Sequence, residues 1–360
     1  MSFNPKIPHN LDLLPPTIDL NSPKYGKLLV KARAELAELK GYSVGLPNPL
    51  LLLSPAILKE SVASSNIENI HTTVAEVLQQ QLFPEAERRG ADKEVLRYRE
   101  AIMQGFVELD KLPVSSRLIV DIARMLVPSA GGYRKTQNFI HNSVTNEIIY
   151  TPPPANEMSR LIGNLENFIN DKGLDVDPLI KSAVAHYQFE AIHPFGDGNG
   201  RTGRILMVLY LVQEHLLHYP ILYISGYINK HRPEYYRLLL EVTRAGRWED
   251  FILFMLEGFY QQAKETKDTL FDMTTEFFQY KKETKEKLPN IYSSELVEQL
   301  FSHPVTNPAA LGKALNVHYV TAGKYLKALA TAGYLKESWH GKYHLYTNKR
   351  LLDVLHARNP

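Results

Sequence analysis

The twelve residues from 193 to 204, His-Pro-Phe-Gly-Asp-Gly-Asn-Gly-Arg-Thr-Gly-Arg, bring together side chains that suit phosphate chemistry. Pro194 disfavours a helical conformation at His193, so the apolar helical run that precedes it must turn at this point. The glycines at alternate positions of the loop can adopt positive φ and let the backbone approach a ligand closely. Backbone N–H groups at the junction between such a loop and the next helix form an anion site.

Charged side chains complete this pattern. Arg201 and Arg204 are three residues apart, so they share one face of the following helix and can hold one phosphate chain together. Asp197 is a hard oxygen ligand of the kind that Mg²⁺ uses when it bridges phosphates. His193 is a base that titrates near neutral pH. The segment therefore predicts a base beside a bound phosphate chain, and the alternative is a helix–helix turn with a buried histidine and two surface arginines.

The segment resembles the motif of the Fic family, HPFx(D/E)GNGRxxR, and it fills every specified position. The resemblance implies transfer of a nucleotide, usually AMP from ATP, to a Ser, Thr or Tyr hydroxyl of a protein. His193 would then deprotonate the hydroxyl, Asp197 would hold Mg²⁺ on the α- and β-phosphates, and Arg204 would bind the γ-phosphate. Phe195 would be an anchor in the core. The nucleotide-binding residues that the resemblance implies within the motif are Gly196, Gly198, Asn199, Gly200, Arg201, Thr202, Gly203 and Arg204.

Tyr235 and Tyr236 form a pair at a place where the family lines its adenine and ribose pocket. Aromatic faces suit a purine, so the resemblance implies the same role here. The alternative is that both tyrosines pack on the core. Thr243 stands where some relatives have an asparagine, and this departure leaves the preference for ATP over another nucleotide open.

Ser64, Glu68 and Asn69 match the inhibition motif of the same family, (S/T)xxxE(G/N), on a helix-compatible stretch from 59 to 70. The resemblance implies that Glu68 pairs with Arg204 and thereby displaces the γ-phosphate. A carboxylate and a phosphate cannot both use one guanidinium fork, so the two compete directly. The alternative is a solvated helix that carries a glutamate.

Residues 133–154 change to β-branched and aromatic sequence around a turn-like patch at 142–146, which predicts a hairpin. The hairpin resembles the Fic flap, which docks an extended target segment by strand addition. An ordinary surface hairpin is the alternative. The target-docking residues that the resemblance implies are Ile148, Ile149, Tyr150 and Thr151.

Helical periodicity dominates the rest of the chain and predicts a mainly α fold: a helical Fic (Fido) core with a short β-hairpin flap, plus a C-terminal winged-helix domain. Residues 1–25 predict an extended arm, 220–228 a strand, and 264–287 a polar helix or linker. The predicted domains are an N-terminal helical region (1–110), the Fic catalytic core (111–265), the polar helix or linker (266–290) and the winged helix (291–360).

The last seventy residues predict three helices and a two-stranded wing, an order that resembles a winged helix-turn-helix domain. DNA contact would require a basic surface on the third helix and the wing. Protein docking or dimerisation is an equal alternative. The residues predicted to lie on that surface are His318, Tyr319, Thr321, Lys324, Lys327, Lys336, His340 and Lys342.

Composition excludes several classes of protein. The 360 residues carry a formal net charge of +2, which argues against a general nucleic-acid coat protein. The absence of cysteine excludes disulfides, thiolate zinc sites and a catalytic thiol. No run approaches the roughly eighteen apolar residues of a membrane span, and residues 1–10 lack the apolar centre of a signal peptide. We therefore expect a cytoplasmic protein without a membrane partner.

Together these patterns predict a protein adenylyltransferase that uses ATP and Mg²⁺ and is inhibited by Glu68 through Arg204. Its partner would be a protein with a hydroxyl side chain, a class that includes a second copy of the chain, and a homodimer is a further hypothesis. Two other functions fit the sequence. The same site could remove AMP from a modified protein with Glu68 orienting a water, or the chain could be a DNA-binding transcription regulator that senses nucleotide.

Overall fold

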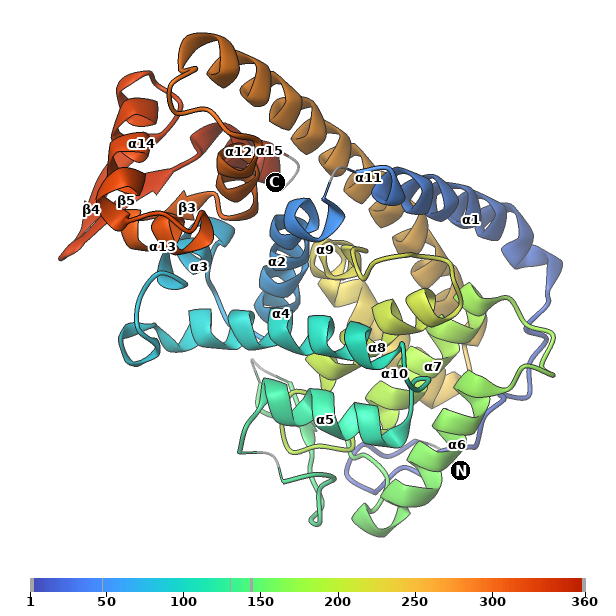
Figure 1. The fold of residues 1–360 in the computed structure, drawn as a ribbon. Coiled ribbons are helices and arrows are strands. Elements are labelled where there is room, and N and C mark those ends of the chain that lie inside the picture. The colour runs from blue at the N-terminus through green and yellow to red at the C-terminus, as the bar shows by residue number, and fades with distance from the viewer. Residues whose placement is uncertain (1–2, 47, 130, 143–144, 358–360) are drawn as a thin grey trace. The chain divides into compact units, whose positions relative to one another are not determined.

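The computed structural model describes residues 3–46, 48–129, 131–142 and 145–357 (Figure 1). The chain forms two compact units that are each discontinuous in sequence: unit 1 comprises 1–40 and 97–263, and unit 2 comprises 41–96 and 264–360. Three helices begin in one unit and end in the other, namely α1 (Pro23–Val44), α4 (Gly90–Glu108) and α11 (Trp248–Lys287). The domain boundaries expected from the sequence stay a prediction, because the units are defined by packing and not by sequence order.

Unit 1 is built around α7 (Pro178–Ile192) and α8 (Asn199–Gln213), which pack against each other (Figure 1). Both helices are buried on nearly every side, as expected for helices that are apolar around their whole circumference. Neighbouring helices contact this pair from several directions. The other helices within unit 1 are α5 (Ser116–Leu126), η2 (Ala155–Glu157), α6 (Met158–Asn170), α9 (Ile224–Lys230) and α10 (Arg232–Ala245).

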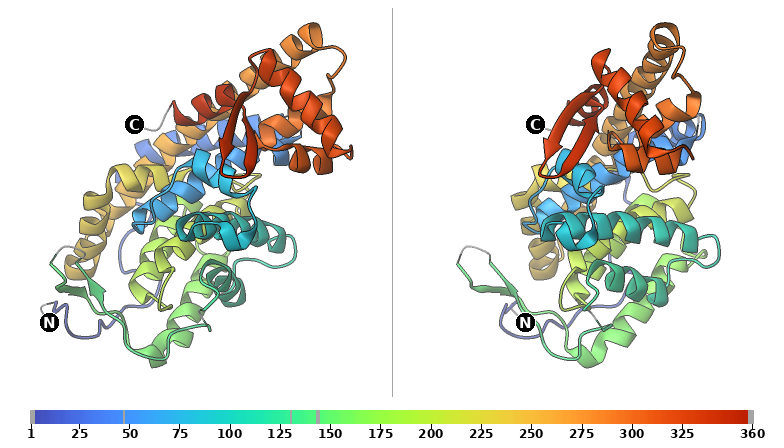
Figure 2. Two further views of the ribbon diagram at one scale, coloured as in Figure 1. Left: turned by 90° about the vertical axis from the view of Figure 1, so that its left-hand side faces the viewer. Right: turned by 60° about the vertical axis from the view of Figure 1, so that its left-hand side comes forward.

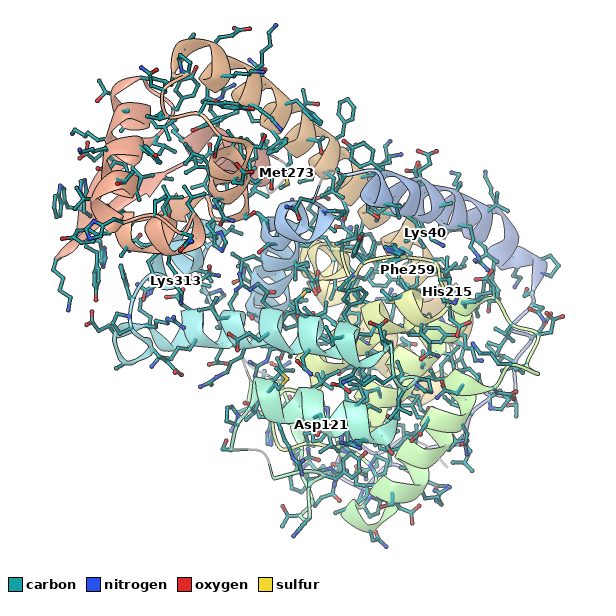
Figure 3. The ribbon with its side chains drawn as sticks, in the orientation of Figure 1. Lys40, Asp121, His215, Phe259, Met273 and Lys313 are labelled. Carbon is teal, nitrogen blue, oxygen red and sulfur yellow. The ribbon has the colours of Figure 1, made fainter. Side chains whose placement is uncertain are left out.

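Specific local features fix the ends of these helices. Asp177 caps α7 by accepting a hydrogen bond from the Leu179 amide at 2.8 Å, and Pro178 occupies the first turn, where its missing N–H costs nothing. Helix α1 is tied to the end of α8 by a 2.7 Å hydrogen bond from Lys40 Nζ to the His215 carbonyl (Figure 3). The first contact therefore fixes the start of α7, and the second attaches α1 to the segment that follows α8.

A small antiparallel hairpin of β1 (Ile140–His141) and β2 (Ile148–Tyr150) projects from unit 1, as predicted (Figure 2). Residues 143 and 144 of its predicted turn lie outside the described residues. Residues 3–22 form the expected extended arm. The arm runs beside the hairpin, where the His9 amide donates to the Thr151 carbonyl at 2.9 Å. The hairpin is therefore held along one side by the N-terminal arm.

The strand expected at 220–228 was wrong, because residues 224–230 form α9. Helix α9 packs so close to α11 that a Cβ on Gly258 would lie 2.8 Å from the Tyr227 ring and 3.2 Å from Ile224. Isoleucine and tyrosine favour strands only when a sheet is present to receive them. Here their neighbours are helices, and burial between helices overrides the local preference.

Unit 2 contains α2 (Pro49–Ile67), which packs against α12 (Ser294–Ser302) and α15 (Lys349–His356). A three-stranded antiparallel sheet has the order β3-β5-β4. The segment expected as a polar helix or linker continues α11, with one face buried through residues that include Met273 and Phe277 (Figure 3). The remaining elements are α3 (Val74–Gln80), η1 (Glu85–Glu87), β3 (Val305–Thr306), α13 (Pro308–Ala314), α14 (Tyr319–Thr331), β4 (Lys336–His340) and β5 (Tyr343–Thr347).

Candidate active site

Helix α7 ends at the histidine of the motif. His193 is its C-cap and adopts left-handed backbone angles (φ 49°, ψ 59°), which are uncommon for a residue other than glycine. The proline that follows disfavours right-handed helical angles at His193, so α7 ends at this residue. A side chain held in this conformation is aimed by the turn itself, so the position of the imidazole depends on whatever stabilises the turn.

The histidine has a defined tautomer. Its Nδ1 lies 3.3 Å from the carbonyl oxygen of Glu190, and a carbonyl can only accept a hydrogen bond. Nδ1 must therefore carry the proton in the neutral ring. The lone pair is then on Nε2, which is the nitrogen that can act as a base.

The next helix begins directly after its N-cap Gly198, whose φ of 78° is left-handed and whose Cβ would lie 3.0 Å from Val127, so a side chain here would be strained. The first amides of α8 have no acceptor within the helix, as at every helix N-terminus. Asp197 accepts a 2.6 Å hydrogen bond from the Gly198 amide, and its side chain is 71% exposed. The loop thus presents an open carboxylate next to the positive end of α8.

Asn199 shapes this loop from inside. Its side-chain amide accepts from the Phe195 N–H and donates to the Phe195 carbonyl, both at 2.9 Å. Phe195 is fully buried and packs beside Tyr133, as expected for an anchor. The Asn199 side chain therefore stabilises the loop. Any contact of this residue with phosphate would have to be made by its backbone N–H.

Two arginines of α8 lie in the interior of unit 1. Arg201 is 2% exposed and Arg204 is 1% exposed. An Arg201 Nη2 atom lies 3.6 Å from Asp197 Oδ1. A cation in the first turn of a helix is disfavoured by the helix dipole, and a buried cation also loses its hydration. An anion bound at this helix end would offset both costs.

Thr202 and Gly203 pack α8 against its surroundings. The Thr202 hydroxyl donates to the Gly198 carbonyl at 2.8 Å. A Cβ on Gly203 would meet Glu190 Oε1 at 2.4 Å and the Phe189 ring at 3.0 Å, so only glycine allows α7 and α8 to approach here. Gly196, by contrast, lies on the exposed part of the loop with no atom near its Cβ direction.

The two tyrosines of α10 have different environments. The Tyr235 ring is buried, and its hydroxyl lies 2.8 Å from His186 Nε2. Tyr236 is 43% exposed, and the Arg232 guanidinium lies 5.9 Å from its ring centre. The Thr243 hydroxyl pairs with the Tyr187 hydroxyl at 2.9 Å. Of the predicted pair, Tyr235 is therefore a core residue, and Tyr236 is the ring that a ligand can reach.

His186 gives a testable pH dependence. Burial, followed by the nearby charge of Arg204, lowers the pKa of His186 to about 3. The folded protein therefore keeps this ring neutral, whereas the unfolded chain protonates it below about pH 6.5. The stability that His186 contributes is complete above pH 6.5 and is lost as the pH falls from there towards 3.

We expect the His186→Gln variant to lose about 2 kcal/mol less unfolding free energy than the wild type when the pH is lowered from 7 to 5. Denaturant titration of both proteins at the two pH values measures the difference. Glutamine can still bond the Tyr235 hydroxyl but has no proton to gain. Identical pH dependence in the two proteins would show that His186 is not a neutral buried ring.

The predicted flap residues divide into two kinds. The Tyr150 hydroxyl donates to the Ala191 carbonyl at 2.8 Å, and burial raises its pKa well above the usual value. The Thr151 hydroxyl donates to the Pro5 carbonyl at 2.6 Å. Ile148 and Ile149 are half-buried. Tyr150 and Thr151 therefore anchor the hairpin, whereas the side chains of Ile148 and Ile149 remain partly exposed.

Sequence reasoning missed Arg134, which lies just before the hairpin. Its backbone N–H donates to the Pro194 carbonyl at 2.8 Å, and its Nε donates to the His193 carbonyl at 3.0 Å. The side chain is almost fully buried. No local pattern distinguishes this arginine from the basic residue next to it, because the carbonyls that its side chain reaches at the end of α7 are 58 and 59 positions away in the chain.

The predicted inhibitory residues lie at the end of α2 in unit 2. Ser64 is fully buried, Glu68 is the C-cap of the helix, and Asn69 adopts a φ of 61°. A carboxylate at the negative end of a helix dipole is unfavourable for the helix itself. Its presence at this end is therefore better explained by an interaction outside the helix than by helix stability.

The wing of unit 2, formed by β4, β5 and the turn between them, contacts other segments of the same unit. Lys342 Nζ pairs with Glu87 at 2.9 Å, and the Tyr343 ring stacks on Phe83 with centroids 4.3 Å apart. On α14, Lys327 pairs with Glu337 at 2.8 Å. Two of the cations expected to face DNA, Lys327 and Lys342, are thus paired with carboxylates. This weakens the basic surface on which DNA contact was predicted.

The site offers few side chains that could bind a metal ion. In the described part of the chain, no group of three or more His, Asp or Glu side chains could hold a metal ion by itself. A single exposed carboxylate, Asp197, matches the way Mg²⁺ binds when substrate phosphates and waters supply its other ligands. The residues present therefore fit Mg²⁺ brought with a phosphate chain. In the same described ranges, no helix is long and apolar enough to cross a bilayer.

The geometry defines a class of mainly helical protein in which one buried helix ends at a histidine and the next begins after a glycine-rich loop. The chain belongs to the Fic/DOC family. The Fic/DOC family N-terminal model matches residues 26–107 and the Fic/DOC family model matches 113–211. A third model, the C-terminal domain of SoFic-like protein adenylyltransferases, matches 277–351.

Named relatives match part of the chain. The protein adenylyltransferase Fic of Culex quinquefasciatus is 33% identical over 132 residues, which is 36% of this chain and 24% of the relative. A probable protein adenylyltransferase of Aquifex aeolicus is 42% identical over 87 residues, 24% of this chain and 25% of the relative. The matched part thus spans about a quarter of the length of these curated relatives.

Solved structures share the fold. A Fic family protein from Desulfovibrio desulfuricans G20 aligns with a TM-score of 0.55 at 19% identity, over 93% of this chain and 97% of the other. Fic-1 (residues 134–508) from C. elegans aligns with a TM-score of 0.53 at 19% identity, over 69% and 73% of the two chains. At these identities the likeness establishes the Fic fold, which confirms the predicted mainly α core with a small hairpin.

Proposed function

We propose that the protein transfers AMP from ATP to a Ser, Thr or Tyr hydroxyl of a protein and releases pyrophosphate. The observation that carries the proposal is the burial of Arg201 and Arg204 at the N-terminal end of α8. Two buried guanidinium groups beside a helix N-terminus place positive charge next to the loop that follows His193. A polyphosphate is the ligand that matches such a site in charge and length.

The proposed chemistry uses one base. The target hydroxyl oxygen attacks the α-phosphorus, the bond from that phosphorus to the bridging oxygen of the β-phosphate breaks, and the hydroxyl proton moves to Nε2 of His193. The tautomer set by the Glu190 carbonyl leaves Nε2 ready to accept this proton. Amides at the start of α8, with Arg201 and Arg204, would stabilise the negative charge that grows on the leaving pyrophosphate.

Asp197 would hold Mg²⁺ together with the phosphates, and the metal would supply charge neutralisation at the α- and β-phosphate oxygens. The exposed Tyr236 ring supports a place for the base of the nucleotide on α10. Because Thr243 is already bonded to Tyr187, its role towards the base stays open. The choice of nucleotide is therefore part of the test below.

Two features support a protein as acceptor. The relatives that match the chain are named protein adenylyltransferases. The hairpin that precedes α7 also carries half-buried Ile148 and Ile149 beside a short two-strand ladder, which suits the docking of an extended segment by strand addition. We propose that this docking brings the target hydroxyl to His193.

We also propose that Glu68 of α2 inhibits transfer by competing with the γ-phosphate for the Arg204 guanidinium. The position of the carboxylate at the end of α2, where the helix dipole disfavours it, supports a role outside the helix. The packing of α2 against α12 and α15 assigns this inhibitory helix to the same compact unit as the C-terminal segment.

The reaction class is tested by the position of the label. We expect α-labelled ATP to leave its label on protein and γ-labelled ATP to release its label as pyrophosphate. The measurement is autoradiography of a cell lysate incubated with the purified chain and either nucleotide, with α-labelled CTP, GTP and UTP in parallel lanes. Retention of γ-label that appears only when the purified chain is added would indicate phosphoryl transfer and refute the proposal.

A further inference from the structure

We infer that Arg134 is a positioning residue that joins the two roots of the flap hairpin to the turn carrying His193. This inference rests on the proposed function, because the turn matters for activity only if His193 is the base. The contacts that carry it can be measured without any activity assay. They involve a single buried side chain and carbonyl groups from three separate segments of unit 1.

The Arg134 guanidinium donates hydrogen bonds to carbonyl oxygens at both ends of the hairpin and at the end of α7. Nε donates to His193 O at 3.0 Å, and Nη2 donates to Ile192 O at 3.4 Å. Nη1 donates to Thr136 O at 3.3 Å, and Nη2 also donates to Pro153 O. Thr136 precedes β1 and Pro153 follows β2, so the two roots of the hairpin and the His193 turn meet at one side chain.

The type of residue suits this place. Carbonyls at the C-terminal end of a helix lack intrahelical donors, and a positive charge there is favoured by the helix dipole. Within the described ranges, carbonyl oxygens are the acceptors that the structure gives this guanidinium, and burial lowers its pKa. A planar fork with five N–H groups can serve several carbonyls at once, whereas a lysine ammonium at the same place could reach only some of them.

A second contact of the hairpin provides an internal comparison. Gln137 Nε2 donates to the Pro152 carbonyl at 2.9 Å and to the Asn138 carbonyl at 3.1 Å. Gln137 therefore joins the same two roots of the hairpin but does not bond the end of α7. Loss of Gln137 should loosen the hairpin alone, and loss of Arg134 should loosen the hairpin together with the His193 turn.

These contacts couple the conformation of the hairpin to the conformation of the His193 turn. A left-handed histidine at a helix end needs its surroundings to hold it, since that conformation is not preferred locally. Arg134 supplies this support through the His193 carbonyl itself. A target segment that orders the hairpin would, through the same guanidinium, order the base.

Hydrogen exchange of full-length Arg134→Lys, Gln137→Ala and wild-type protein tests the link. In Arg134→Lys we expect amide exchange in peptides covering 193–198 to rise about tenfold or more, with the middle of α7 (179–188) unchanged. In Gln137→Ala we expect faster exchange in 138–150 only. Unchanged exchange at 193–198 in Arg134→Lys would overturn the inference.

Transfer assays add the functional readout. With saturating ATP and target, we expect kcat of Arg134→Lys to fall about 10²-fold while the KM for ATP changes little, because a small displacement of the base costs rate and not nucleotide binding. Gln137→Ala should retain kcat within about threefold. A loss confined to the KM for ATP would contradict a positioning role.

Variants of Arg134 that fail to fold would also test the inference. If Arg134→Lys does not fold, Arg134→Gln is measured in its place, since glutamine keeps one planar N–H₂ group. Global unfolding of both variants, seen as fast exchange throughout 179–188, would make Arg134 a residue of the fold as a whole and overturn selective positioning. If the wild type transfers no nucleotide, the proposed function fails, yet the exchange result still decides whether Arg134 holds the turn.

Discussion

Replacement of His193 by alanine is expected to lower nucleotide transfer to protein by about 10²- to 10⁴-fold, the usual contribution of a general base. The structure supports this size of effect through the geometry of the ring. Nδ1 is bonded to the Glu190 carbonyl, so in the neutral ring Nε2 carries the lone pair that would accept the hydroxyl proton. The measurement is the initial rate of transfer of α-label from ATP, at saturating ATP, for both proteins.

The variant must be separated from a folding defect. Asparagine tolerates left-handed backbone angles better than alanine and cannot accept a proton at neutral pH, so His193→Asn should fold normally and be equally inactive. His218→Ala removes an exposed histidine from the same unit and serves as the matched control. Equal rates for the wild type and both His193 variants would refute the role of the base. Nucleotide binding should persist in each, because Arg201 and Arg204 are untouched.

Replacement of Glu68 by glycine is expected to raise transfer roughly 5- to 150-fold, the range that corresponds to a coupling of about 1–3 kcal/mol between two ligands of one site. Glycine is well tolerated at the end of a helix, and removal of a carboxylate from the negative end of α2 also relieves an unfavourable charge. The variant should therefore fold as well as the wild type. The same α-label assay, including label on the chain itself, measures the gain.

The proposed mechanism of inhibition makes the gain depend on Arg204. If the carboxylate and the γ-phosphate compete for that guanidinium, Glu68→Gly should have no further effect in a protein that already carries Arg204→Ala. Glu85→Gly removes an exposed glutamate from the same unit and should leave the rate unchanged. A gain that survives in the Arg204→Ala background would show that Glu68 acts elsewhere. No gain in the single variant would exclude inhibition altogether.

The sequence alone was sufficient for the features that depend on neighbours along the chain. The turn at His193 follows from the proline after it, and the start of α8 follows from a glycine that can take positive φ. The hairpin and the helical periodicity also have local causes. The motif is itself a local feature, and the family and the fold class therefore follow from the order of residues along the chain.

Tertiary structure decided how individual side chains are used. Asn199 binds the Phe195 backbone, Tyr235 is a core residue bonded to His186, and Tyr150 anchors the hairpin to α7. In each case the residue type was compatible with ligand binding. Burial gives each side chain a partner within the fold, and for Tyr235 and Tyr150 that partner is more than forty positions away in the chain.

Sequence reasoning failed for the same physical reason at two places: it expected a strand at 220–228, and it overlooked Arg134. Helix α9 forms because its isoleucines and its tyrosine meet other helices, and Arg134 matters because carbonyls from three separate segments converge on it. Local sequence determines which conformations of a segment are low in free energy. Which of them is adopted, and which side chain supports the histidine, depends on atoms that only the folded chain brings together.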